Sequence, residues 1–366
     1  MNGHLEWPDK PGDALRAWLA QTPEEALDPL QPIIDSHHHL LDRRPRPPLP
    51  EGTRTHQRYL ADDLMEDIRG GGHNVIDTVF VECLSMYSED ATDPFRSAGE
   101  VQFVQGIAAM AASGLYGKGV RCCGGIVGFA DLSLGAEVEP VLHVLKSAGK
   151  NFRGIRHAHA WHESPAIANS HHPTADIPGL LGTQSFRAGF AVLDDLGLTF
   201  DCWGYHTQLS EVAELAAAFP GVTIVLNHIG GPVACGPYEG QRTGQVFESW
   251  AKGIRRVADC PNVVVKLGGC GMPMYGFGHH CGEAGPPSSP ILATAWQPYF
   301  DIVIDAYGPE RCMFESNFPV DKVSCSYTSL WNAFKLIAED LGMTSVQKDE
   351  LFFGTAARVY TLSAND

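Results

Sequence analysis

The chain has 366 residues, of which 44% are hydrophobic and 19% charged, and its formal net charge is −17. This composition is typical of a soluble globular protein that buries a large core, in one large domain or two smaller ones. The acidic balance and the lack of a basic stripe argue against a nucleic-acid partner. No apolar run is long enough to span a bilayer, and residues 1–13 lack the pattern of a signal peptide, so we expect a cytoplasmic protein with no membrane partner.

Short apolar runs recur along the chain, and each is followed by a polar or Gly-rich segment and then by a helical pattern. We expect residues 1–31 to form an N-terminal arm with a short helix at 13–21. The expected strands are residues 33–35, 75–82, 121–128, 152–156, 198–201, 223–227, 263–267 and 312–316. The expected helices are residues 60–70, 100–113, 138–148, 185–196, 209–218, 245–258, 296–307, 327–341 and 345–360.

Strands that alternate with helices imply parallel pairing, and eight such units predict a (β/α)8 TIM barrel, here a single α/β domain over residues 32–366. The alternative is a doubly wound sheet with an appended domain. It lacks support because no G-x-G-x-x-G motif follows the first strand. Two long irregular segments, 158–181 and 268–290, follow the fourth and seventh strands. In a barrel they lie on the catalytic face, where long loops usually serve binding or catalysis.

The first strand ends in the sequence Asp-Ser-His-His-His at residues 35–39. Because side chains alternate along a strand, His37 and His39 point to one side and His38 to the other. Two imidazoles on one side of a strand end suit a metal ion or the oxygens of a substrate. From these residues alone, a His-rich turn without chemistry is an equal alternative.

Histidines gather at the expected strand ends. Of the 16 in the chain, 12 lie at or just past the carboxyl end of a strand: His37, His38, His39, His157, His159, His162, His171, His172, His206, His228, His279 and His280. A lone histidine is more often a capped or solvated loop residue. Four strand ends that each carry histidine favour a shared site.

Charged residues fall on the same expected face. Glu82 ends the second strand, Arg156 ends the fourth, and Lys266 lies inside the seventh, where a charge is costly unless it is paired. Arg156 could hold a substrate carboxylate or pair with Glu82. The aromatic side chains of Trp203 and Tyr205 could line a pocket, although core packing explains them equally well.

The ten cysteines include no Cys-x-x-Cys pair, which argues against a structural zinc knuckle. Most sit in apolar strand segments, as small buried residues do in a reducing compartment. Cys202, close in sequence to His206, is the one candidate for a nucleophilic pair.

Five motifs together resemble the amidohydrolase superfamily, in its amidohydrolase-related (amidohydrolase 2) branch of sugar-lactone and dicarboxylate-lactone hydrolases and decarboxylases. They are Asp-Ser-His-His-His at 35–39, Arg-Gly-Ile-Arg at 153–156, Asn-His-Ile-Gly at 227–230, Met-Phe-Glu-Ser-Asn-Phe-Pro at 313–319 and Gly-Thr-Ala-Ala-Arg-Val-Tyr at 354–360. The resemblance implies a barrel whose site lies at the strand carboxyl ends.

The resemblance also implies a set of site residues. The histidines that line the site in that family correspond to His37, His39, His206 and His228. Metal-dependent members place them around one divalent ion, and Zn²⁺ or Mn²⁺ suits such ligands. Some lactonases of the branch are metal-free, so the cofactor stays open. The family often forms dimers, which makes a homodimer an expectation.

The eighth strand departs from the family pattern. The family usually has Gly-Ser-Asp there, with the Asp as metal ligand or general base, whereas this chain has Glu315, Ser316 and Asn317. Asn317 cannot accept a proton at neutral pH. We therefore hypothesise that Glu315 does part of this work. The alternative is a structural carboxylate paired with Arg156 or Lys266.

The function that these residues favour is hydrolysis of a small lactone by activated water. Arg156 with His37 and His39, or a metal they hold, would polarise the carbonyl, and Glu315, Glu82 or His206 would activate water. His228 would orient the substrate or complete the metal site. The expected substrate-binding residues are His157, Asn317, Lys266, Trp203 and Tyr205. The alternatives are a decarboxylase or hydratase on the same barrel, and a binding protein without catalysis.

Overall fold

The computed structural model describes residues 13–42, 58–117, 119–281 and 285–362. Its centre is an eight-stranded sheet in the order β1-β4-β5-β6-β7-β8-β9-β10, with every neighbouring pair parallel. The strands are β1 (Pro32–His38), β4 (Asn74–Val81), β5 (Arg121–Gly128), β6 (Phe152–Arg156), β7 (Thr199–Cys202), β8 (Ile224–Leu226), β9 (Val263–Leu267) and β10 (Cys312–Phe314). The predicted (β/α)8 barrel is confirmed, with each strand within a few residues of its expected position.

The ring closes through the segment that follows β10. Asn317 donates its backbone N–H to the carbonyl of His37 at 2.8 Å, and His39 donates to the carbonyl of Phe318 at 2.8 Å. His38 and Phe318 form a parallel bridge. The segment after the last strand therefore pairs with the carboxyl end of the first strand, β1, where the histidines lie. A separate short pair, β2 (Leu41–Asp42) and β3 (Arg58–Tyr59), stands outside the barrel.

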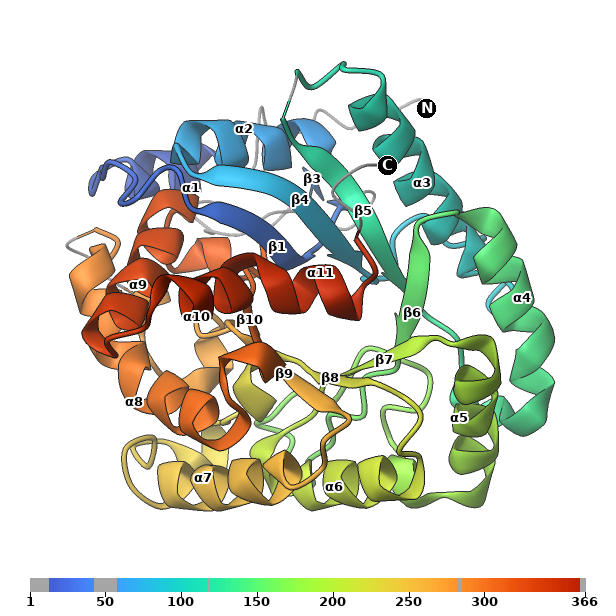
Figure 1. Ribbon diagram of the computed structural model, residues 1–366. Coiled ribbons are helices and arrows are strands. Elements are labelled where there is room, and N and C mark those ends of the chain that lie inside the picture. Colours follow the sequence, from blue (N-terminus) through green and yellow to red (C-terminus); the bar gives the residue numbers. More distant parts are fainter. Residues whose placement is uncertain (1–12, 43–57, 118, 282–284, 363–366) are drawn as a thin grey trace, which may run out of the picture.

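Helices surround the strands (Figure 1). They are α1 (Asp13–Leu19), α2 (Ala61–Gly71), α3 (Ala98–Ala112), α4 (Glu139–Ala148), α5 (Gln184–Leu196), α6 (Leu209–Ala218), α7 (Gln245–Ala258), α8 (Ser289–Tyr307), α9 (Tyr327–Asp340), α10 (Ser345–Asp349) and α11 (Thr355–Val359). Within the described segments, no helix is both long enough and apolar enough to cross a membrane.

One helix is longer than the sequence predicts. We expected a loop to residue 290 and a helix from 296, whereas α8 begins at Ser289 and carries Pro290 in its first turn and Pro298 in its interior. Proline is tolerated in a first turn because the N–H it lacks would have no partner there. Because proline usually indicates a break in a helix, the sequence pattern did not predict the first turns of α8. The loop after β9 is shorter than predicted for the same reason.

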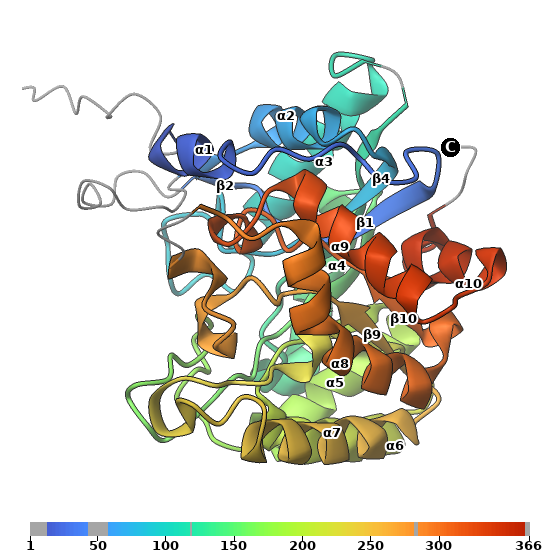
Figure 2. The same ribbon diagram turned by 90° about the vertical axis from the view of Figure 1, so that its left-hand side faces the viewer.

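The core has two layers. The larger one packs the outer faces of the strands against the helices. The smaller one fills the barrel with strand residues such as Ile34, Val79 and Val225, together with Ala356, Tyr360 and Leu362 from the end of the chain. Figure 1 shows α11 lying across the barrel opening, and Figure 2 shows the connections after the strands gathered at the left, opposite α10. One end of the barrel is thus plugged, and the site lies at the other.

Candidate active site

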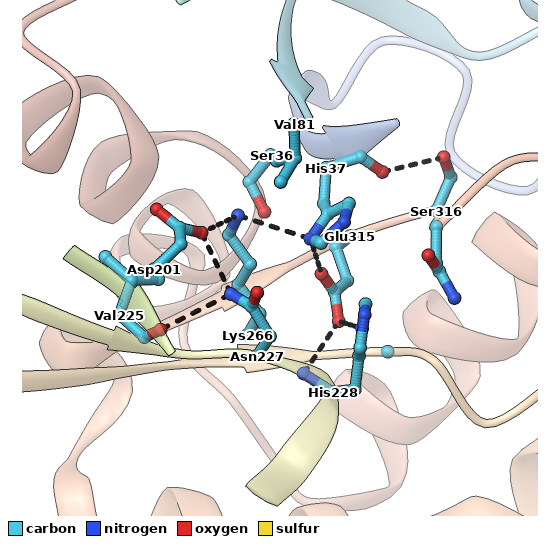
Figure 3. Close-up of polar contacts among 12 residues, drawn as sticks. Ser36, His37, Val81, Asp201, Val225, Asn227, His228, Lys266, Glu315 and Ser316 are labelled. Atoms are coloured by element: carbon cyan, nitrogen blue, oxygen red, sulfur yellow. Dashed lines mark hydrogen bonds and ion pairs between the residues drawn. The ribbon is translucent and has the colours of Figure 1, made fainter. Parts of the chain in front are cut away.

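The carboxylate of Glu315, just past β10, is the centre of the candidate site. Its Oε2 lies 2.8 Å from Nδ1 of His37, and its Oε1 lies 2.6 Å from Nδ1 of His228 and 3.1 Å from the His228 backbone N–H. Figure 3 shows this carboxylate between the two rings. All three side chains are at most 3% exposed. The expected alternative, in which Glu315 pairs with Arg156 or Lys266, is not what the contacts show.

Local backbone conformation brings these groups together. His228 and Ile229 have positive φ angles of 54° and 50°, a conformation that costs free energy for residues with a Cβ and that persists where surrounding structure imposes it. On the opposite side, Gly269 has a φ angle of 70°, and a Cβ there would lie 2.5 Å from the Cβ of His228. A Cβ at Gly268 would lie 2.3 Å from Glu315 Cγ. The two glycines after β9 therefore allow the backbone to pass directly over the pair.

The hydrogen bonds define which nitrogen of each ring is free. His39 Nδ1 lies 2.7 Å from the carbonyl oxygen of Val81 and must donate to it, so its Nε2 carries a lone pair when the ring is neutral. The Nδ1 atom of His228 donates to Glu315, which leaves its Nε2 with a lone pair. Nε2 of His37 lies 3.5 Å from Arg156 Nη1, which can only donate, so this nitrogen carries a lone pair as well. Burial lowers the pKa of His37, His39 and His228 well below the usual 6.5, so the rings are neutral at pH 7.

These free nitrogens fit a divalent cation. Nε2 of His37 and Nε2 of His39 lie 3.3 Å apart. Two nitrogens bound to one tetrahedral zinc ion, each about 2.0–2.1 Å from it, are separated by about 3.3–3.4 Å. Two lone pairs that face each other at this distance repel unless a cation or a proton lies between them. Metal-binding histidines commonly donate their other ring N–H to a carboxylate that fixes their orientation, and Glu315 is placed to be that carboxylate.

An ion pair between Arg156 and Glu82 flanks the histidines. Arg156 donates from Nε to Glu82 Oε1 and from Nη2 to the Glu82 carbonyl, both at 2.6 Å, and its Nη1 lies 3.5 Å from His37 Nε2. Burial opposes ionisation of Glu82, but the guanidinium and two neighbouring histidines hold its pKa well below the usual range. Arg156 thus links the carboxylate to the histidine group.

A second buried ion pair lies deeper, on β7 and β9. Lys266 Nζ lies 2.7 Å from Asp201 Oδ1, and both side chains are fully buried. Asp201 also accepts hydrogen bonds from Asn227 Nδ2 at 2.9 Å and from the Tyr360 hydroxyl at 3.0 Å. Lys266 Nζ also lies 3.4 Å from His37 Nδ1, so the ion pair contacts the histidine group. Because its ammonium is held by Asp201, we expect Lys266 to have little freedom to bind substrate.

Two further groups have the residue types of metal ligands but fit an ion poorly. In the group of Glu82, His171 and His172, His172 Nδ1 accepts the Ala158 N–H at 2.9 Å, so its Nε2, 3.2 Å from Glu82 Oε1, carries the hydrogen and has no lone pair for a metal. In the group of His38, Cys122 and Cys123, burial raises the pKa of the Cys123 thiol well above its usual value, which disfavours the thiolate that a metal needs.

Several predicted site residues lie apart from the central group. His206 Nδ1 accepts the Val233 N–H at 3.3 Å, and across the described residues no hydrogen bond or ion pair joins His206 to His37, His228 or Glu315. His157 is fully buried and bonds to Thr174 Oγ1 at 2.7 Å. Asn317, with φ 53°, turns its amide to Asp321 Oδ1 at 2.8 Å. The roles assigned to these residues stay predictions.

The aromatic and thiol candidates have defined partners. The Tyr205 hydroxyl donates to the Ala168 carbonyl, and Trp203 stacks on His171 with ring centroids 6.3 Å apart. Cys202 Sγ lies 3.7 Å from Nδ1 of His159 rather than near His206, and burial raises the pKa of this thiol well above its usual value. Trp203 therefore borders the site, whereas the geometry gives no support to Cys202 as a nucleophile.

Sequence reasoning missed the role of the loop after β6. It counted His171 and His172 among the strand-end histidines but assigned them no place in the site, whereas both contact Glu82, at 3.3 and 3.2 Å. The available signal was the His-His pair in a long loop on the catalytic face. Its distance from any strand concealed which carboxylate the pair would reach.

Comparison with known proteins shows the family of the chain and supports its fold. The family model described as "Amidohydrolase" matches residues 34–362. The uncharacterized protein y4mH of Sinorhizobium fredii is 32% identical over 339 residues, which cover 90% of this chain and 98% of that protein. An L-fucono-1,5-lactonase of Burkholderia multivorans is 27% identical over 65% of this chain and 71% of its own length. A solved amidohydrolase from Burkholderia multivorans with bound zinc superposes with a TM-score of 0.64 at 22% identity, covering 90% of this chain and 99% of that one.

Proposed function

The chain belongs to the amidohydrolase family, and on that premise we propose that it hydrolyses the cyclic ester of a small, neutral, hydroxylated lactone. The observation that carries the proposal is the Arg156–Glu82 ion pair beside the facing Nε2 atoms of His37 and His39. It combines groups that can polarise a carbonyl with a carboxylate that can take a proton from water. The likeness to an L-fucono-1,5-lactonase supports the same reaction.

The charges of the site favour a neutral substrate. Arg156 is paired with Glu82 and Lys266 with Asp201, so each buried cation already has a carboxylate partner. A substrate with one or two carboxylates would have to displace one of these partners, which would leave a buried charge unpaired. Hydroxyl groups of a sugar lactone require no such exchange.

The polarising groups would act on the ester carbonyl. A substrate carbonyl oxygen placed beside His37 and Arg156 would receive hydrogen bonds from the guanidinium as negative charge develops on it. A divalent ion, zinc in our proposal, held by Nε2 of His37 and His39 would supply further positive charge to that oxygen. His228, oriented by Glu315, would position the substrate from the opposite side.

Water activation is assigned to Glu82 by comparison of the three candidates. Both oxygens of Glu315 lie against imidazole rings, at 2.6 Å from His228 Nδ1 and 2.8 Å from His37 Nδ1, and His206 lies outside the group. Glu82 Oε1 contacts Arg156, His171 and His172, whereas His171 is the one contact recorded for Oε2 within the described chain. With fewer partners than Oε1, this oxygen is the one that we assign to accept a proton from an attacking water.

The test is a substrate screen with metal analysis. Neutral aldonolactones, carboxylated lactones and aromatic carboxylic acids would be offered to protein purified without an affinity tag, with ring opening followed by proton release and decarboxylation by CO₂. We expect turnover of neutral lactones and about one equivalent of zinc. Release of CO₂ from an aromatic acid, without lactone opening, would replace this proposal with the lyase alternative.

A further inference from the structure

Lactone hydrolysis creates a proton inside a buried site. Water and a neutral lactone give a hydroxycarboxylate and H⁺, so one proton must leave for each ester opened. The side chains of Glu82, Glu315, His37, His228, Lys266 and Asp201 are 0–3% exposed, and Arg156 is 4% exposed. Because none of these groups meets bulk water, a neighbouring group has to carry the proton outward.

His171 is placed to be that group. Its Nε2 lies 3.3 Å from both oxygens of Glu82, while its side chain is 34% exposed. Among the described titratable groups bonded to the site carboxylates and cations, no other is as exposed. One face of the ring stacks near Trp203 and an edge meets His172, at centroid distances of 6.3 and 4.4 Å, so the ring is held in place.

The two nitrogens of His171 differ in surroundings. Nε2 faces Glu82, and Nδ1 makes no hydrogen bond within the described residues. His172 cannot do the same work, because its Nδ1 accepts the Ala158 backbone N–H and its side chain is fully buried. Its Nε2–H therefore stays fixed in the buried site, 3.2 Å from Glu82 Oε1, whereas His171 can exchange its ring hydrogen with solvent.

We propose that His171 carries the proton released by hydrolysis from Glu82 to solvent; the inference rests on the proposed function. Water adds to the lactone carbonyl carbon as one of its O–H bonds breaks and the proton passes to Glu82 Oε2. The ring C–O bond then breaks, and the second proton of that water goes to the departing alkoxide, leaving a carboxylate. Protonation of Glu82 removes the acceptor of the His171 Nε2–H, and the ring passes to its Nδ1–H form by giving the Nε2 hydrogen to water and taking another at Nδ1. Glu82 then gives its proton to Nε2, and Nδ1 releases its own to water, which restores the Nε2–H form that faces Glu82.

The experiment measures lactone opening in weakly buffered solution with wild type, His171→Ala and His162→Asn. His162 belongs to the same loop and bonds to Ser164 N and the Tyr238 hydroxyl, not to Glu82, and asparagine retains the acceptor for Ser164 N. We expect kcat of His171→Ala to fall about tenfold or more, within the range of single acid–base groups, with KM nearly unchanged. Added imidazole should restore kcat in a saturable manner, and His162→Asn should match wild type.

The outcomes separate this inference from the proposed function. If wild type opens no lactone, the proposed function fails and the relay as written fails with it. If wild type is active but His171→Ala keeps its kcat, or loses it without recovery by imidazole, His171 is at most a structural part of the loop and the inference is overturned. A readout without turnover is the ¹⁵N shift of the His171 ring, which should report Nε2–H in wild type and change in Glu82→Gln.

Discussion

The Nδ1 atom of His228 lies 2.6 Å from Oε1 of Glu315, and this contact joins the sixth and eighth barrel strands at the candidate site. The carboxylate keeps the ring in the form whose Nε2 is free. It also accepts the His228 backbone N–H, which helps to hold a residue with a positive φ angle. Glu315 is thus an orienting group, and replacing one of its oxygens by an amide nitrogen should change metal binding before it changes the fold.

Replacement of Glu315 by glutamine should weaken zinc binding about 10–100-fold, the usual effect of losing a partner that orients a ligand. The glutamine amide has an NH2 donor in place of one acceptor oxygen of Glu315. The ring that faces this donor therefore loses its acceptor and turns. Competition with a chromophoric chelator measures the affinity, and Glu214→Gln, an exposed change on α6, is the control. Unchanged zinc affinity in a folded Glu315→Gln protein would contradict the role.

Replacement of Glu82 by glutamine should have the opposite profile. An amide cannot take the proton from water, so kcat should fall about 10²–10⁴-fold, while zinc affinity stays within a few-fold of wild type because Glu82 orients neither His37 nor His39. Thermal unfolding must show that the variant remains folded, since Arg156 loses the charge of its partner. A Glu82→Gln enzyme with normal kcat would return water activation to Glu315.

The close approach at Gly269 can be separated from backbone strain by a matched pair. Gly269 and Gly278 have φ angles of 70° and 76°, but a Cβ at Gly278 would meet no atom of the described residues within 4 Å. Alanine at Gly278 should cost about 1–2 kcal/mol of stability, the strain of a left-handed residue, with kcat unchanged. Alanine at Gly269 should cost more and should reduce kcat, because it displaces His228. Equal effects of the two changes in urea unfolding and turnover would refute this account.

Stability should depend on pH through His73. Burial, with the Lys335 ammonium beside it, lowers the pKa of His73 to about 4 in the folded state, below the unfolded value of 6.5. The contribution is complete above about pH 6.5 and is lost as the pH falls through 4, so protonation favours unfolding by about 2 kcal/mol over this window. His73 Nδ1 accepts from Lys335 Nζ at 2.9 Å, and asparagine retains that acceptor without titrating.

The measurement is the urea midpoint of wild type and His73→Asn at pH 7.5, 5.5 and 4.5. Wild type should lose about 2 kcal/mol more than the variant between the highest and lowest pH. Other groups titrate in both proteins and cancel in the comparison. Parallel curves for the two proteins would show that His73 does not couple folding to pH.

The barrel could be predicted because its signals are local and periodic. Buried parallel strands are short apolar runs, and eight of them alternate with amphipathic helices, so the order of elements sufficed. The grouping of His37, His39, His228, Arg156 and Glu82 followed from the rule that strand carboxyl ends meet on one face. The partner of Glu315 did not follow, because it depends on the left-handed turn at His228 and on the glycines after β9.

Loops explain the remaining differences. Sequence position placed Cys202 beside His206, but the chain turns after β7, and His159 from another loop reaches the thiol instead. Likewise, His171 and His172 approach Glu82 from a loop that begins at the end of β6. Contacts of this kind join residues about 40 to 90 positions apart and carry no periodic signal.

The segment of residues 356–362, which fills the barrel interior, has a consequence for biosynthesis. All eight strands are specified by residue 314, yet the hydroxyl that bonds to Asp201 belongs to Tyr360, and Leu362 fills the same interior. A nascent chain emerging from the ribosome can therefore assemble the barrel wall while its lumen stays hollow and Asp201 lacks one partner. Residues 356–362 are translated after all eight strands and would act as a latch, and until they arrive the open wall is the state that chaperones and proteases encounter.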